Sequence, residues 1–168
     1  MSRPAPTLRS RAIGWLAQRE HSRVELRRKL LAAVARQQRA AADAADAAEG
    51  VPAAAAPTEQ DIDDLLDGLA AKGLLSTERF VESRLLARAP RYGNLRIRQE
   101  LAQHGVAVDA ATAQQLQASE LERARAVWAK RYEGLAPDAG GRARQARFLT
   151  ARGFSAEVVR RIVMGRDG

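Results

Sequence analysis

The chain of 168 residues contains no cysteine, and this absence removes several kinds of chemistry together. Without a thiol there are no disulfides, no thiolate nucleophile and no cysteine-ligated zinc. Only two histidines are present, His21 and His104, and neither has potential ligands clustered beside it. A glycine-rich phosphate loop, a serine elbow and an HExxH pattern are also missing. The sequence therefore predicts a protein that is not an enzyme and that uses no metal and no cofactor.

Aromatic residues are scarce as well, with two Trp, two Tyr and three Phe in the whole chain. The core must therefore be thin and built mostly from Leu, Val, Ile and Ala. The apolar stretch at residues 12–17 is too short for a signal peptide, and no run approaches the length of a transmembrane helix. We therefore expect a cytoplasmic protein that does not enter a membrane.

Charge is abundant and unevenly distributed, with a net charge of +8. Residues 1–42 hold ten Lys or Arg against two acids, residues 43–83 hold two against ten, and residues 84–168 hold sixteen against eight. Two basic segments thus flank an acidic one. This pattern favours a polyanion or an acidic protein as the partner.

The composition favours helices, because Ala, Leu, Arg, Gln and Glu dominate and no segment alternates cleanly between apolar and polar residues. Local signals mark where helices begin and end. The predicted caps are Thr7, Ser22, Thr58, Ser76 or Thr77, Asn94, Asp109 and Ser155, with helix-ending glycines at Gly73, Gly105 and Gly153. We expect a further helix from about Arg142 to Arg152, after a loop at residues 135–141. The predicted fold is all-α.

A pattern in residues 80–110 returns 48 positions later, so that Phe80 is matched by Trp128 and Gly105 by Gly153. An earlier copy places Leu30 on Leu101. A recurring set of apolar anchors with a closing glycine indicates repeats of one supersecondary unit. We predict three tandem three-helix repeats, stacked along an axis, at residues 1–75, 76–118 and 119–168. Residues 36–57 are Ala-rich and are predicted to be an insert in repeat one, a helical extension with a flexible return.

Two local patterns suggest chemistry but have plainer interpretations. Four acids at residues 61–67 could suggest a metal site, yet no His, Cys or calcium loop accompanies them. A solvated helix face that offsets the basic segments is favoured. The segment from Arg96 to Leu116 resembles a DNA-reading helix-turn-helix. Its second helix begins with Ala110–Ala113, which contains no base-reading side chain in the first turn, so a structural turn is favoured.

Basic residues recur at equivalent places, on the second helix of each repeat or at its entry. If the repeats stack, these side chains fall in register along one side and form a surface that binds the partner or DNA. The alternative is that the arginines only keep the protein in solution; their recurrence favours a binding surface. The apolar register turns Arg27 and Arg98 toward solvent. The candidate residues are Arg23, Arg27, Arg28 and Lys29 in repeat one, Arg91, Arg96 and Arg98 in repeat two, and Arg142, Arg144, Arg147 and Arg152 in repeat three.

Residues 12–30, from Ala12 to Leu30, form a block that looks like the opening of the RecX family, the regulators of the RecA recombinase. Residues 73–76, 79–84 and 148–154 are similar to its later signatures, so the resemblance spans nearly the whole chain. The chain departs from the family at residues 36–57, where a short connection is usual, and at Ser76–Glu78, where Asp is common.

The resemblance implies a curved, elongated molecule without catalytic residues. It implies a regulator that lodges in the groove of the RecA–DNA filament and restrains filament growth, ATP hydrolysis and strand exchange, in recombination, DNA repair and the SOS response. The expected partners are RecA, the RecA–DNA filament and, weakly and without sequence preference, single- and double-stranded DNA; the protein is expected to be a monomer. The alternative is a stand-alone DNA-binding protein that acts without RecA.

Overall fold

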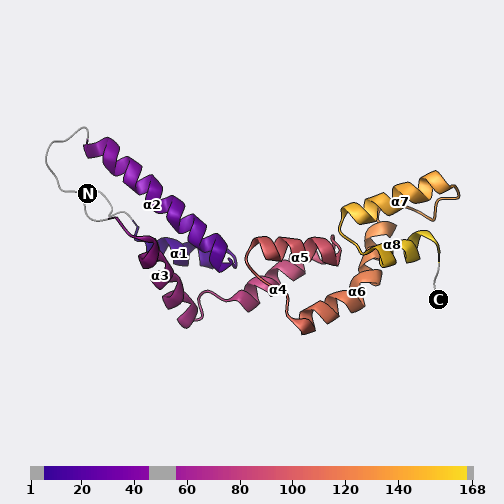
Figure 1. The fold of residues 1–168 in the computed structure, drawn as a ribbon, viewed down its shortest axis with the longest axis horizontal. Coiled ribbons are helices and arrows are strands. Elements are labelled where there is room, and N and C mark those ends of the chain that lie inside the picture. The colour runs from indigo at the N-terminus through magenta and orange to yellow at the C-terminus, as the bar shows by residue number, and fades with distance from the viewer. Residues whose placement is uncertain (1–5, 46–55, 166–168) are drawn as a thin grey trace. The chain divides into compact units, whose positions relative to one another are not determined.

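The computed structural model describes residues 6–45 and 56–165, and within these ranges the chain forms eight α-helices and no strand (Figure 1). The prediction of an all-α fold is confirmed. The helices group into two compact units, residues 1–80 and residues 81–168. Each unit has its own set of buried apolar side chains.

The first unit contains α1 (Leu8–Gln18), α2 (Arg23–Ala45), α3 (Glu59–Ala71) and the start of α4 (Thr77–Arg88). The predicted caps form: Thr7 accepts a hydrogen bond from the Ser10 N–H, and Thr58 and Asp61 make a reciprocal capping box. Apolar residues spaced three and four apart give each helix one buried face. The shared core consists of Ala12, Leu26, Leu30, Val34, Ile62, Leu66, Leu69 and Leu75.

Helix α2 continues well past the core of this unit. Val34 is its last buried residue, and residues 35–43 are all exposed. The helix nevertheless runs to Ala45, because alanine favours helix without needing a packing partner. The return that the sequence predicts after this helix falls largely on residues 46–55, outside the described residues.

The second unit contains the rest of α4 together with α5 (Asn94–Gln103), α6 (Ala110–Ala129), α7 (Ala139–Ala151) and α8 (Ala156–Val163). Helix α6 is the longest of these, and it packs against α5, α7 and α8 (Figure 1). Gly105 and Gly153 end their helices at φ values of 71° and 81°, as the sequence predicted. The core of this unit includes Ala124, Val127, Leu149, Phe154, Val158 and Val159.

Two predicted helix starts in this unit were wrong. Asn94 does not cap α5: Gly93 occupies the cap position without a side-chain bond, and Asn94 is the first helical residue. Helix α7 begins at Ala139 rather than near Arg142, because the Asp138 side chain accepts the Gly141 N–H at 2.7 Å. A carboxylate at this position compensates the unpaired N–H groups of the first turn.

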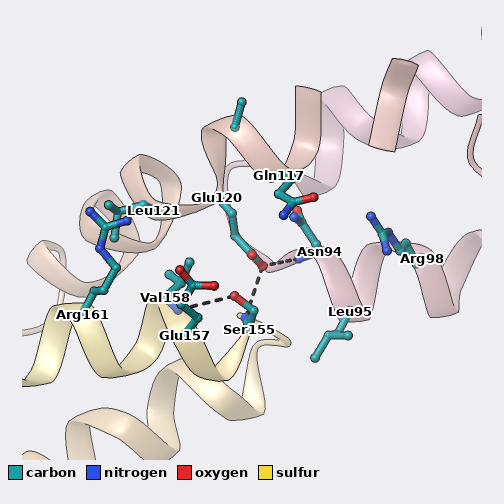
Figure 2. A pocket seen from close by; sticks show the side chains of 11 residues that line it. Asn94, Leu95, Arg98, Gln117, Glu120, Leu121, Ser155, Glu157, Val158 and Arg161 are labelled. Carbon is teal, nitrogen blue, oxygen red and sulfur yellow. Dashed lines mark hydrogen bonds between the residues drawn. The ribbon is translucent and has the colours of Figure 1, made fainter. Parts of the chain in front are cut away.

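One buried carboxylate holds the N-termini of two helices together. Glu120 of α6 is only 4% exposed, and its Oε1 accepts the Asn94 N–H at 2.9 Å and the Ser155 N–H at 3.3 Å (Figure 2). Asn94 begins α5, and Ser155 caps α8. Both helix starts carry partial positive charge, so a single anion stabilises them together. The Glu120 carboxylate therefore takes the place of the cap that Asn94 was predicted to supply.

The half-buried Arg123, one turn after Glu120, completes this joint. Its guanidinium donates to the carbonyl oxygens of Ala89, Tyr92 and Leu116 at 2.8–3.2 Å and to Asn94 Oδ1 at 2.5 Å. These acceptors lie where α4 ends, where α5 begins and on α6 itself. Burial lowers the pKa of Arg123. The charge is retained, because arginine keeps its proton at any ordinary pH.

The two segments that Glu120 joins also touch through their backbones. The Gly93 N–H donates to the Arg152 carbonyl at 2.9 Å, and the Leu95 N–H donates to the Gly153 carbonyl at 3.0 Å. A Cβ on Gly93 would lie 2.2 Å from the Phe154 nitrogen, and one on Gly153 would lie 2.5 Å from the Arg96 Cβ. Only glycine therefore fits at either position.

We predict that Gly93→Ala destabilises the second unit by about 1–3 kcal/mol, because its methyl group meets backbone that cannot move aside. Gly134→Ala is the matched control in the same unit, since an added Cβ there meets nothing within 4 Å. Urea titration in a Trp15→Phe background, followed by Trp128 fluorescence, reports on this unit alone. Equal stability of the two alanine variants would contradict the close backbone contact.

Candidate partner-binding surface

The candidate cations of the first unit are largely occupied by the acidic helix α3. Arg23 Nη1 lies 2.5 Å from Asp67 Oδ1, and Arg27 contacts Asp63 at 2.9 Å and Glu59 at 2.8 Å. The hydrogen bond from Arg27 holds the pKa of Asp63 below its usual range, and the same contacts raise the pKa of Arg27. The acids at residues 59–67 thus offset part of the first basic segment.

Sequence reasoning treated Arg27 as a cation that is free to meet a partner, and this needs correction. The Arg27 side chain is one-third exposed, and it forms ion pairs with two carboxylates of α3, those of Glu59 and Asp63. Helices α2 and α3 run antiparallel, so Arg23 and Arg27 meet acids in reverse order along α3. An external anion would have to compete with these carboxylates for Arg27.

Lys29 and Arg28 also differ in whether their charge has a neighbour within the first unit. The Lys29 ammonium lies 3.1 Å from His21 Nε2 and 4.5 Å from the centre of the Trp15 ring. His21 is buried, and this burial lowers its pKa, which suits a neutral ring that accepts from Lys29. Arg28 is exposed and makes no ion pair with any described residue. Of the four candidates in this unit, Arg28 is the most available.

The candidate cations of the second unit are mostly exposed and lack carboxylate partners. Within residues 6–45 and 56–165, no ion pair involves Arg91, Arg98 or Arg147. Arg142 donates to the Pro137 carbonyl at 3.2 Å. The Gly141 N–H lowers the pKa of Asp138 most, and the charge of Arg144 adds to that lowering. These cations are available to an anionic partner.

Arg96 and Arg152 lie close to the joint between α5 and α8. Arg96 donates to the Ala151 carbonyl at 3.3 Å, and its guanidinium lies 4.6 Å from the centre of the Tyr92 ring. Arg152 donates to the Arg91 carbonyl at 3.4 Å and lies 4.6 Å from the centre of the Phe148 ring. The structure therefore brings Arg91, Arg96 and Arg152 together where the backbones at Gly93 and Gly153 touch.

Sequence reasoning missed two cations beside this group. Lys130 and Arg131, at the end of α6, line one pocket with Arg91 and Arg152. They do not recur in the other repeats, and recurrence was the criterion that selected the candidates. The available signal was local: a Lys-Arg pair within a few residues of Trp128 and Tyr132.

A groove opens beside Glu120, between α5, α6 and α8 (Figure 2). Its lining combines apolar Leu95 and Val158 with the cations Arg98 and Arg161. Leu95 is 61% exposed. The groove also contains Glu157, so its charge is mixed.

The structure favours the plain interpretations of the two other patterns. Among the described residues, no group of three or more His, Cys, Asp or Glu side chains is placed to hold a metal ion. The helix expected to read DNA is α6, in which Leu116 is buried and Glu120 and Arg123 belong to the joint. The turn before α6 contains Gly105 at a φ of 71°, which ends α5 in a conformation that glycine favours.

No helix in the described residues is both long enough and apolar enough to span a bilayer.

Taken together, these features define an all-α protein of helical repeats whose second unit carries exposed cations without carboxylate partners among the described residues. A family model described as RecX, third three-helix domain, matches residues 118–163. A "Regulatory protein RecX" of Ralstonia nicotianae is 44% identical over 163 residues, covering 96% of this chain and 89% of that protein. Another, from Leptothrix cholodnii, is 43% identical over 168 residues, covering 99% and 93%. The chain belongs to the RecX family of regulatory proteins.

Two solved structures share this fold at low sequence identity. The crystal structure of RecX from Lactobacillus salivarius is 17% identical, covers 94% of this chain and 93% of its own, and superposes with a TM-score of 0.61. A second crystal structure, of a regulatory protein RecX, is 18% identical, covers 95% of this chain and 70% of its own, and has a TM-score of 0.63.

We predict that Arg27→Glu lowers the melting temperature of the first unit, because it places three acids together at the α2–α3 contact. Arg28→Glu is the matched control: Arg28 is exposed, so its reversal should change stability by no more than about 0.5 kcal/mol. Adding Asp63→Lys to Arg27→Glu should recover much of the loss. The difference in melting temperature between Arg27→Glu and Arg28→Glu should shrink in high salt, which screens exposed charges. Equal melting of the two single variants would show that the ion pairs do not stabilise the unit.

Proposed function

We propose that this chain binds RecA and the RecA–DNA filament and inhibits filament extension, ATP hydrolysis and strand exchange in recombination and DNA repair. It acts as a monomer in the cytoplasm, under the SOS response, and catalyses no reaction itself. The observation that carries the proposal is the 44% identity, over 96% of the chain, to a protein named "Regulatory protein RecX". The exposed cations of residues 81–168 support it, since they suit a polyanionic filament.

A second candidate is a stand-alone DNA-binding protein that acts without RecA. The net charge of +8 and the unpaired arginines favour it equally, because duplex and single-stranded DNA attract any cationic surface. The two candidates differ in what limits inhibition. A regulator that blocks filament growth acts at few sites, whereas a competitor for DNA must cover the strand.

We predict that the protein inhibits RecA ATPase on single-stranded DNA at a molar ratio well below one per RecA. The measurement is a titration into RecA with DNA in excess, so that free strand remains for RecA. If inhibition begins only when the protein is sufficient to coat all the DNA, competition explains it and the filament proposal fails.

Charge reversal separates a specific surface from net charge. Arg98→Glu with Arg147→Glu changes two exposed candidate cations of the second unit, and it should weaken inhibition strongly. Arg9→Glu with Arg160→Glu is the matched control, because both residues are exposed, lie outside the candidate set and give the same net charge. Equal loss in the two double variants would show that total charge alone governs inhibition.

A further inference from the structure

The pocket at the end of α6 is lined by cations and aromatic rings and by no acid. Its lining includes Arg91, Tyr92, Lys130, Arg131, Phe148 and Arg152. Its volume of about 520 Å³ is ample for a small ligand group, since such sites commonly occupy about 300–1,000 Å³. Four positive charges around one cavity that has no carboxylate in its lining repel one another, so an anion from outside the chain would be attracted there.

A second arginine cluster in the same unit shows what a self-contained arrangement looks like. Arg84 and Arg88 lie 3.3 Å and 3.0 Å from the carboxylate of Glu100, which lines the same pocket. There the chain supplies its own counter-ion. Within the described residues, no carboxylate forms an ion pair with Arg131, Lys130 or Arg152.

Aromatic rings hold the arginines of this pocket in place. The guanidinium carbons of Arg131 and Arg152 lie 5.0 Å and 4.6 Å from the centre of the Phe148 ring. Tyr132 supports that ring edge-on, with 5.5 Å between the ring centres. Cation–π contacts position a guanidinium without using its N–H groups, which stay available as donors. Bidentate recognition of phosphate uses this fixed fork of donors.

We infer that this pocket binds the phosphate backbone of single-stranded nucleic acid, with Arg91, Lys130, Arg131 and Arg152 as the phosphate-binding residues. A strand is favoured over an isolated anion because the cations continue beyond the lining: the exposed Arg96 lies 4.6 Å from the centre of the Tyr92 ring, which lines the pocket. Single strands are favoured over duplex because Tyr92 and Phe148 offer aromatic surface beside the cations, an arrangement that unpaired nucleotides exploit. The inference deepens the second candidate function, binding to DNA, and it does not depend on RecA.

The test measures binding of a fluorescent oligothymidylate to the full chain, without RecA, over a range of salt concentrations. Lys130→Gln with Arg131→Gln should weaken binding about five- to tenfold. It should also make the log–log salt dependence shallower by about 0.7 for each phosphate that is no longer neutralised. The control is Lys72→Gln with Arg160→Gln, which removes one exposed Lys and one exposed Arg outside the pocket. Equal weakening in both double variants would overturn the inference.

Phe148→Leu adds an arm that leaves net charge unchanged. Leucine keeps the side chain apolar but removes the ring that positions Arg131 and Arg152. We expect weaker binding of the oligomer with a similar salt slope, because the cations remain but are less well placed. Thermal melting checks that the fold persists, and if Leu destabilises it, Phe148→Tyr should restore both melting and binding. Full affinity in a folded Phe148→Leu protein would show that the ring contacts have no part in binding.

Other anionic ligands test whether the pocket prefers a nucleic-acid strand to a mononucleotide, inorganic phosphate or an acidic polypeptide. Arginine Nε–H resonances of Arg131 and Arg152 should shift on addition of the oligomer, and much less with thymidine monophosphate or inorganic phosphate at equal phosphate concentration. Mononucleotide binding as tight as the oligomer's would make the pocket a nucleotide site. Equally tight polyglutamate binding that disappears in the pocket variant would make it a receptor for acidic protein. Either result overturns the assignment to a strand.

The RecA proposal and this inference can fail separately. A wild-type protein that leaves RecA ATPase untouched, yet loses oligomer binding in the pocket variant, would remove the proposed regulation and keep the pocket. If the pocket variant binds the oligomer normally while the wild type inhibits RecA, the pocket inference fails and the proposed regulation of RecA stands.

Discussion

The second unit depends on one buried carboxylate. Glu120 accepts the Asn94 and Ser155 N–H groups, and so it links the start of α5 to the start of α8 through α6. An isolated carboxylate costs several kcal/mol to bury, and here two helix starts and the neighbouring Arg123 offset that cost. Because each of these groups would be left unsatisfied without the others, the helices keep one register. Lys130 and Arg131 at the end of α6 and Arg152 at the end of α7 are positioned by the helices that this joint holds together.

The same residue type plays opposite parts in the two units. On α2, Arg23 and Arg27 meet carboxylates of α3 and neutralise them within the unit. At the end of α6, Arg131 meets aromatic rings instead, which position its charge without cancelling it. Charge counting along the sequence assigns both segments as basic, but only the arginines of the second kind keep a charge that no carboxylate in the described part of the chain offsets. Neighbours, and not residue counts, decide which arginines can bind a partner.

Local features of the fold were predictable, and long-range ones were not. Thr58, Asp109 and Ser155 cap their helices as expected, because a cap depends on residues three positions away. Asn94 failed as a cap because a carboxylate 26 residues away took the role. Among the cations that line the pocket at the end of α6, recurrence found Arg91 and Arg152 but passed over Lys130 and Arg131, which only the fold brings beside them. The pairing of Arg27 likewise required the antiparallel packing of α2 on α3.

The contact between Gly93 and Gly153 gives the second unit a mechanical property. Backbone meets backbone there, through two hydrogen bonds of 2.9 Å and 3.0 Å, with no side chain in between. Most packed helices can absorb a displacement by changing rotamers, which makes their interface compliant. At the two glycines there is no rotamer to change, so a displacement of the turn before α8 should move the start of α5 with it while the two hydrogen bonds hold. The two segments should therefore shift as one body, and the link should give way only when those hydrogen bonds break.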